Sequence, residues 1–203
     1  MIPPTNSLDR AKALLQGMKG VLRTRDILRL RIHPRTLYAL RDSGAVEQVS
    51  RGVYRTASAE PLANPDLCTV AARAPKGVVC LISALAFHEM TTQIPHQVWL
   101  ALERGSRPPK ISHPPLRVLW FTGPAFTEGI ENHTIDGVTV RIYSPEKTLA
   151  DCFKYRRKIG IDVAVEALRL YRRNRKPDVK GVLHLARICR VERVMRPYLE
   201  SLL

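Results

Sequence analysis

The hydrophobic pattern at the start of the chain predicts short helices separated by tight turns. Apolar residues spaced for one face of a helix run from Ser7 to Lys19, and they resume after Thr24, which is placed to act as an N-cap. Residues 31–33 would then form a turn. Pro34 suits the first position of the next helix because its missing N–H would have no partner there, and Gly44 suits the residue just past the helix end.

Beyond Gly44 the spacing of apolar residues changes and predicts the two strands of a β-hairpin. Val46, Val49 and Val53 mark these strands, and the Ser-Arg-Gly of residues 50–52 would be the tip. Two short helices around a turn, followed by a small hairpin, form the pattern of a winged helix-turn-helix. A wing that ends in Ser-Arg-Gly is able to reach a phosphate or a minor groove.

The second predicted helix exposes residues suited to reading DNA. Turning Leu37 and Leu40 inward, at about 100° per residue, turns Arg35 and Tyr38 outward and makes them the predicted base-edge contacts. Asp42 also points outward, where it would accept a hydrogen bond from a cytosine amino group or pair with an arginine. The full set of predicted DNA-binding residues is Arg25, Arg31, Arg35, Thr36, Tyr38, Arg41, Arg51 and Arg55.

The composition of residues 58–64, with prolines and small side chains nearby, predicts a linker between two domains. A winged helix-turn-helix domain would occupy residues 1–57, and a mixed α/β domain residues 65–203. The strands expected in the second domain are 78–82, 98–102, 118–121, 130–135 and 138–142.

Turn and cap signals order the rest of the second domain. Asp136-Gly137 is a strong type I′ hairpin signal between the last two expected strands. Ser83 and Ser144 are placed as helix caps, and beyond Ser144 the periodicity is helical. The predicted fold class is therefore α+β, with an N-terminal winged helix-turn-helix followed by a mixed α/β domain that ends in a helical bundle.

Charge points to a polyanionic partner. The net charge is +15, with +7 in residues 1–57, zero in residues 58–143 and +8 in residues 144–203. The N-terminal excess favours double-stranded DNA over a winged helix that makes only protein contacts. The C-terminal excess fits a second DNA contact, an RNA contact or an acidic protein. Its candidate residues are Lys154, Arg156, Arg157, Arg172, Arg173 and Arg175.

No motif indicates a catalytic residue, a metal or a cofactor. The four cysteines include no Cys-x-x-Cys pair, and the six histidines are equally dispersed. The carboxylates do not form the arrangement of a metal-dependent nuclease, so we expect no enzyme, with a nuclease as the less favoured alternative. Without a signal peptide or an apolar run of membrane length, we expect a cytoplasmic protein with reduced thiols, monomeric in solution.

Four segments together carry a family resemblance that covers nearly the whole chain. They are LRTRDIL, SGAVEQVSRGVYR, CLISALAFHEMTTQIPHQVWLALERGSR and VRIYSPEKTLADCFKYRRKIGIDVAVEALR. Their succession resembles the AbiEi family of type IV antitoxins and transcriptional regulators. The resemblance implies a DNA-binding domain that represses its own operon and a C-terminal domain that counters a nucleotidyltransferase-like toxin without a stable complex. The C-terminal basic residues would then form an antitoxin surface. A plain repressor without a toxin partner would have the same sequence features.

Overall fold

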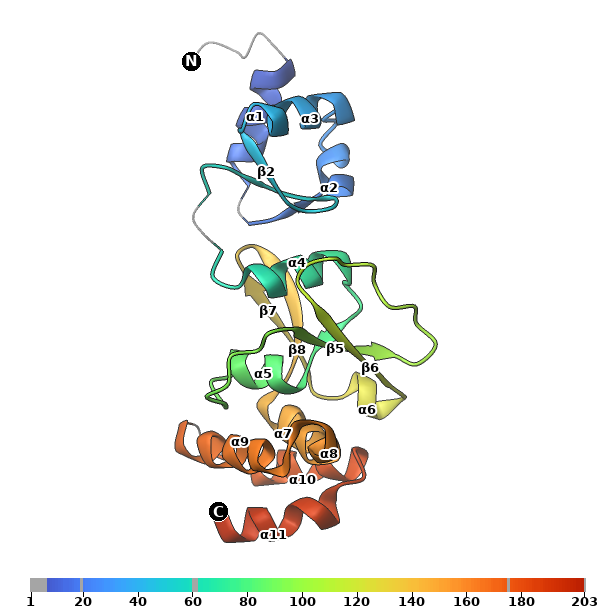
Figure 1. Ribbon diagram of the computed structural model, residues 1–203, viewed down its shortest axis with the longest axis vertical. Coiled ribbons are helices and arrows are strands. Elements are labelled where there is room, and N and C mark those ends of the chain that lie inside the picture. The colour runs from blue at the N-terminus through green and yellow to red at the C-terminus, as the bar shows by residue number, and fades with distance from the viewer. Residues whose placement is uncertain (1–6, 19, 60–61, 175, 203) are drawn as a thin grey trace. The chain divides into compact units, whose positions relative to one another are not determined.

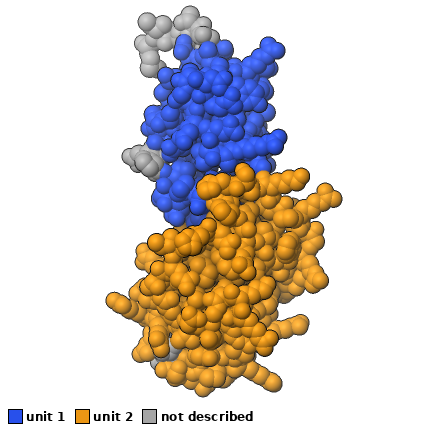
Figure 2. All heavy atoms as spheres, viewed as in Figure 1, with its two compact units in different colours: residues 1–75, 133–140 blue, residues 76–132, 141–203 orange. Residues whose placement is uncertain are grey.

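The structure is a computed structural model that describes residues 7–18, 20–59, 62–174 and 176–202 (Figure 1). Contacts divide the chain into two units (Figure 2). The first unit holds residues 1–75 with 133–140, and the second holds residues 76–132 with 141–203. The predicted linker, residues 58–64, contains no helix or strand in its described part, but the helix that follows it groups with the N-terminal elements. The predicted boundary stays a prediction.

The first unit begins with three helices and a small antiparallel sheet. The core under these elements includes Ala11, Leu15, Ile27, Leu37 and Leu40. The sheet has the strand order β1-β3-β2. Strand β3 therefore lies in the middle, paired antiparallel with its hairpin partner β2 on one side and with β1, the strand before α2, on the other. The elements are α1 (Ser7–Gln16), β1 (Leu22–Arg23), α2 (Thr24–Arg29), α3 (Pro34–Asp42), β2 (Val46–Ser50) and β3 (Val53–Thr56).

The ends of α3 follow local sequence signals. Pro34 lies in its first turn, and the side chain of His33 accepts a hydrogen bond from the Arg35 N–H at 3.2 Å. At the other end Gly44 has a φ of +74°, and its N–H donates to the Arg41 carbonyl. The glycine therefore ends the helix as predicted, by supplying the left-handed conformation that other residues rarely adopt.

The prediction that Thr24 caps α2 is wrong. Arg23 occupies the N-cap position without a side-chain cap, and Thr24 is already helical. The reason is a tertiary contact, because Arg23 still pairs with Val53 in the sheet and the Thr24 N–H donates to the Gly52 carbonyl at 3.0 Å. The strand pairing fixes where the helix can begin.

A five-stranded mixed sheet with the order β6-β5-β4-β8-β7 dominates the rest of the fold. Strand β4 pairs antiparallel with β5 and parallel with β8, while β5 and β6 are parallel. Asp136 and Gly137 both have positive φ, as a type I′ turn requires. The strands are β4 (Val78–Val79), β5 (Val98–Glu103), β6 (Leu116–Phe121), β7 (Ile130–Ile135) and β8 (Val138–Tyr143).

Two expectations near β4 are wrong. The strand predicted for residues 78–82 ends at Val79, because the chain turns into a helix at Leu81. Ser83 lies inside that helix and does not cap it. Its hydroxyl instead accepts a hydrogen bond from the Trp99 N–H at 3.0 Å, which ties the helix to β5. The Ser83 hydroxyl therefore binds the backbone of a neighbouring strand, and it does not cap its own helix.

Helices α7 to α11 gather on one side of the sheet in the second unit (Figure 1). Their packed face includes Leu149, Phe153, Leu168, Tyr171 and Met195, all nearly or completely buried. The predicted α+β class with a closing helical bundle is confirmed. Among the helices that the structure describes, none combines the length and apolarity needed to cross a membrane. The remaining helices are α4 (Pro65–Arg73), α5 (Leu81–Phe87), α6 (Pro124–Thr127), α7 (Pro145–Lys154), α8 (Arg156–Ile159), α9 (Ile161–Asn174), α10 (Val179–Ile188) and α11 (Glu192–Leu202).

Two glycines of the first unit differ in what a side chain would meet. Gly20 and Gly44 both have positive φ, but a Cβ atom on Gly20 would overlap the Asp136 carbonyl, whereas nothing lies within 4 Å of one on Gly44. Gly44→Ala should cost about 1 kcal/mol of stability through backbone strain, and Gly20→Ala should cost clearly more. Urea unfolding of the two variants tests this. Equal losses would contradict it.

Candidate nucleic-acid interface

One face of α3 packs on the core, and the opposite face is exposed to solvent. Leu37 and Leu40 are buried as predicted, while Arg35 is exposed and Tyr38 keeps 47% of its residue surface accessible. Thr36 lies half-buried on the flank. The orientation follows from the helical periodicity, because two inward leucines three residues apart fix which residues face outward.

A polar groove separates this face from the wing, which we define as the β2–β3 hairpin. The tip of the wing is formed by Arg51, which is exposed, and Gly52, whose φ is +75°. The groove has a volume of about 400 Å³ and lies on α3, the start of α2 and the wing. Its lining includes Thr24, Tyr38, Arg41, Gln48, Arg51 and Gly52. Polar side chains of this kind, beside a projecting helix, suit contacts with a phosphate backbone.

Several of the predicted DNA-binding arginines have carboxylate partners. Arg41 donates from Nε and Nη2 to Asp42 at 2.9 and 2.8 Å, and its guanidinium lies 5.2 Å from the centre of the Tyr38 ring. Two roles were expected for Asp42, a hydrogen bond from cytosine and an ion pair with an arginine. In the structure Asp42 forms the ion pair, with Arg41. Arg55 donates to Glu47 across the wing at 2.7 Å. These two cations are therefore partly compensated within the protein.

The remaining predicted arginines are more available. Arg25 lies 3.6 Å from Asp26, an ion pair that it shares with Arg29. Arg31 is exposed in the turn before α3 with a φ of +60°. Within the part of the chain that the structure describes, no carboxylate lies at ion-pair distance from Arg31, Arg35 or Arg51. Their uncompensated charge surrounds the outward face of α3 and the wing.

The C-terminal basic residues fall into two groups. In the first group Arg156 donates to the Phe153 carbonyl at 2.9 Å, and Lys154 lies 5.8 Å from the Phe121 ring, so both also serve local packing. Arg157 beside them is exposed. In the second group Arg172 and Arg173 are exposed in the last turn of α9. Arg175 lies outside the described residues.

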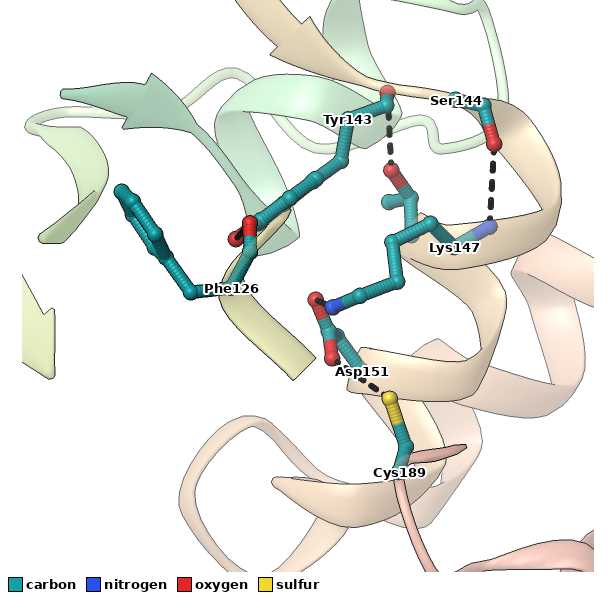
Figure 3. A network of polar contacts seen from close by, with 7 residues as sticks. Phe126, Tyr143, Ser144, Lys147, Asp151 and Cys189 are labelled. Atoms are coloured by element: carbon teal, nitrogen blue, oxygen red, sulfur yellow. Dashed lines mark hydrogen bonds and ion pairs between the residues drawn. The ribbon is translucent and has the colours of Figure 1, made fainter. Parts of the chain in front are cut away.

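A fully buried ion pair lies in the second unit (Figure 3). Lys147 and Asp151 lie one turn apart in α7, contact each other through Nζ and Oδ2, and have no exposed surface. The Lys147 ammonium also lies 4.1 Å from the centre of the Tyr143 ring, and the Cys189 thiol donates to Asp151 Oδ1 at 3.3 Å. Burial raises the pKa of Asp151, and the charge of Lys147 opposes that shift. Both polar groups are thus satisfied inside the core.

Two of the four segments that carry the family resemblance meet next to this pair. His88, in the segment that begins CLISALAFHEM, places Nε2 2.8 Å from the carbonyl of Tyr143, in the segment that begins VRIYSPEK. The same carbonyl also accepts a hydrogen bond from the Thr148 hydroxyl. Ser144 caps α7 by accepting from the Lys147 N–H at 3.2 Å. Sequence reasoning found the Ser144 cap but missed the burial of Lys147, for which the only signal was its four-residue spacing from Asp151. Because Lys147 and Asp151 have no exposed surface, we assign this ion pair a structural role inside the core.

Potential metal ligands do not gather in the described residues: no group of three or more His, Cys, Asp or Glu side chains could hold an ion. The four cysteines are buried, and none of them forms a disulfide. Burial raises the pKa of the Cys68 and Cys189 thiols to about 12, so both stay protonated at neutral pH.

The first unit therefore has the architecture of a winged helix-turn-helix. Its residues 9–57 match the family model described as "Transcriptional regulator, AbiEi antitoxin", which confirms the resemblance over this segment. A crystal structure of the RV2827C protein from Mycobacterium tuberculosis is similar in fold, with a TM-score of 0.57 and 14% sequence identity. The likeness covers 98% of this chain and 82% of that one. Comparison with curated proteins gives no match.

Breaking the buried ion pair should cost far more than breaking an exposed one. Lys147→Met leaves the Asp151 carboxylate without its cation in the core and should destabilise the protein by roughly 3–5 kcal/mol. The double variant Lys147→Met with Asp151→Leu should recover much of this loss, because no charge is left to bury. Urea unfolding provides the measurement.

An exposed pair on α11 serves as the control. Arg196 donates to Glu192 at 2.6 Å with the same four-residue spacing, but in contact with solvent. Arg196→Met should therefore change stability little. If the single and double variants at the buried pair unfolded alike, the assigned role of the pair would be wrong.

Proposed function

We propose that the protein is a sequence-specific DNA-binding regulator that represses its own operon and acts as a type IV antitoxin against a nucleotidyltransferase-like toxin. The observation that carries the DNA-binding part is the outward face of α3, with Arg35 and Tyr38 exposed beside a polar groove and the wing. The family match over residues 9–57 supports the same assignment.

The mechanism follows from the geometry of α3. Arg35 stands in the first turn of the helix, the part of a recognition helix that reaches deepest into a major groove. Its planar guanidinium fits the O6 and N7 atoms of guanine, while Tyr38 is placed to contact a thymine methyl group or a phosphate. Arg51 at the wing tip would then contact the neighbouring backbone without reading sequence.

The antitoxin part rests on the resemblance and on the second basic group. Arg172 and Arg173 offer an exposed cationic surface at the end of α9, far along the chain from α3. A type IV antitoxin acts without a stable complex with its toxin, so this surface would engage a shared target or a transient partner. The Lys147–Asp151 pair has no exposed surface, so a substrate in solution does not reach it. We assign the protein no catalytic activity.

The DNA-binding assignment is tested with three arginine variants of the full chain on DNA from upstream of its own reading frame. Arg35→Ala should lose roughly 1–3 kcal/mol of binding and relax the preference at one base pair. Arg51→Ala should weaken all sequences about equally and lower the salt slope by about one.

Arg41→Ala is the matched control, because Asp42 already compensates that guanidinium. It should change affinity less than Arg35→Ala. Competition binding with single base-pair substitutions in the site gives the readout. An Arg35→Ala protein with the affinity and sequence preference of the parent would refute the assignment.

The antitoxin assignment is tested in cells that express the toxin encoded beside this gene. Replacing Arg172 and Arg173 by Glu should impair protection without unfolding the protein, because both side chains are exposed at a helix end. The same change at Arg104 and Arg107, also exposed, controls for total charge and should leave protection intact. If the Arg172 and Arg173 variant protects cells as well as the parent, these residues do not form an antitoxin surface. Their charge would then only keep the end of α9 solvated or contact DNA. No toxin in the neighbouring frame would favour a plain repressor.

A further inference from the structure

The loop between α5 and β5 is fastened to α9 by two side-chain hydrogen bonds (Figure 1). Thr92 donates from its hydroxyl to Glu166 Oε1 at 2.8 Å, and Asn174 donates from Nδ2 to the Glu89 carbonyl at 3.1 Å. All four residues belong to the second unit. The loop is therefore held against α9 at two points that lie about two turns of the helix apart.

This fastened loop presents an isoleucine to solvent. Ile94 lies two residues beyond Thr92 and keeps 82% of its surface accessible, more than any other large apolar residue that the structure describes. Its β-branched side chain has few rotamers to lose, so its burial against a partner would cost little conformational entropy. Single exposed apolar residues are common, and the surroundings of Ile94 decide what it is suited to bind.

Two cations lie on the face of α9 that meets this loop. Arg169 follows Glu166 by three residues and Arg173 follows it by seven, so all three share one face of the helix. Both arginines are exposed. Within the described residues, neither has a carboxylate at ion-pair distance. We call Ile94 together with Arg169 and Arg173 the Ile94 surface.

The Ile94 surface suits a protein partner better than a nucleic acid. Single-stranded nucleic acids stack their bases on aromatic rings, and isoleucine has no ring. A protein interface instead combines an apolar anchor at its centre with charged groups at its rim. The two arginines favour a partner whose rim is acidic, in keeping with the net charge of +8 in residues 144–203.

We propose that the antitoxin contacts its toxin directly and transiently through the Ile94 surface, with Ile94 in an apolar pocket of the toxin and the two arginines facing carboxylates beside it. The inference rests on the proposed antitoxin function and deepens it, because it identifies the toxin as the transient partner and adds Ile94 and Arg169 to Arg173. A single apolar anchor gives a small interface, and complexes with small interfaces dissociate readily. The proposal therefore agrees with a system that forms no stable complex.

The first test measures protection of cells that express the toxin encoded beside this gene. Ile94→Ser should raise the amount of the full chain needed for protection by about tenfold, because the apolar anchor is lost. Ile94→Leu keeps an apolar side chain and should protect like the parent. Because Ile94 is exposed, Ile94→Ser should unfold at the same urea concentration as the parent, so lost protection would not reflect lost folding.

The matched control is Ile161, the first residue of α9, which is also exposed but lies at the other end of the helix. Ile161→Ser should leave protection intact. The second test is photo-crosslinking in the same cells. A benzophenone amino acid in place of Ile94 should become joined to the toxin on irradiation, whereas the same amino acid in place of Ile161 should not.

The outcomes are distinguishable. Toxin joined at position 94 but not at position 161, together with lost protection by Ile94→Ser, supports the proposal. If the parent protects cells and Ile94→Ser protects them equally, the Ile94 surface is not the toxin contact, although the proposed function stands. Crosslinking of position 94 to RNA in place of the toxin also overturns the inference. If the parent does not protect cells, the proposed antitoxin function fails and this inference fails with it.

Discussion

The pairing of two residues of β1 with β3 is the constraint on which the candidate interface depends. Leu22 pairs with Tyr54 and Arg23 with Val53, and the helix α2 begins at the next residue. Because α3 follows α2 after a short turn, this strand pairing helps to fix where α3 lies relative to the wing. The groove beside α3 opens at this junction, where Thr24 and Gly52 line it. A few backbone hydrogen bonds thereby position the exposed arginines of α3 and the wing.

Charge is used in opposite ways in the two units. In the second unit Lys147 is taken out of water and is compensated by a carboxylate and two aromatic rings, so its charge contributes to the internal order of the fold. In the first unit, Arg35 and Arg51 keep their charge in solvent without a carboxylate partner among the described residues. An exposed arginine adds little to stability, and its value lies in what it can bind.

Signals carried by neighbouring residues could be predicted from the sequence. Pro34 and Gly44 bound α3 as expected, and Asp136-Gly137 makes its turn, because each effect depends on local backbone conformation. Features set by distant residues could not be predicted. Thr24 lost its cap role to the sheet, and Arg73 reaches a wing tip 22 residues away. The residues next to Thr24 and Arg73 in the sequence give no indication of these contacts.

The first unit is discontinuous, and this affects the order in which it forms during synthesis. Its segment of residues 133–140 belongs to the β7–β8 hairpin, which the ribosome makes long after residue 75. Gly20 approaches the Asp136 carbonyl in that segment, and the Ala63 N–H donates to the Asp136 carboxylate. A nascent chain that carries only the N-terminal elements therefore lacks part of its own unit. Completion of the first unit therefore waits until translation has passed the β7–β8 hairpin.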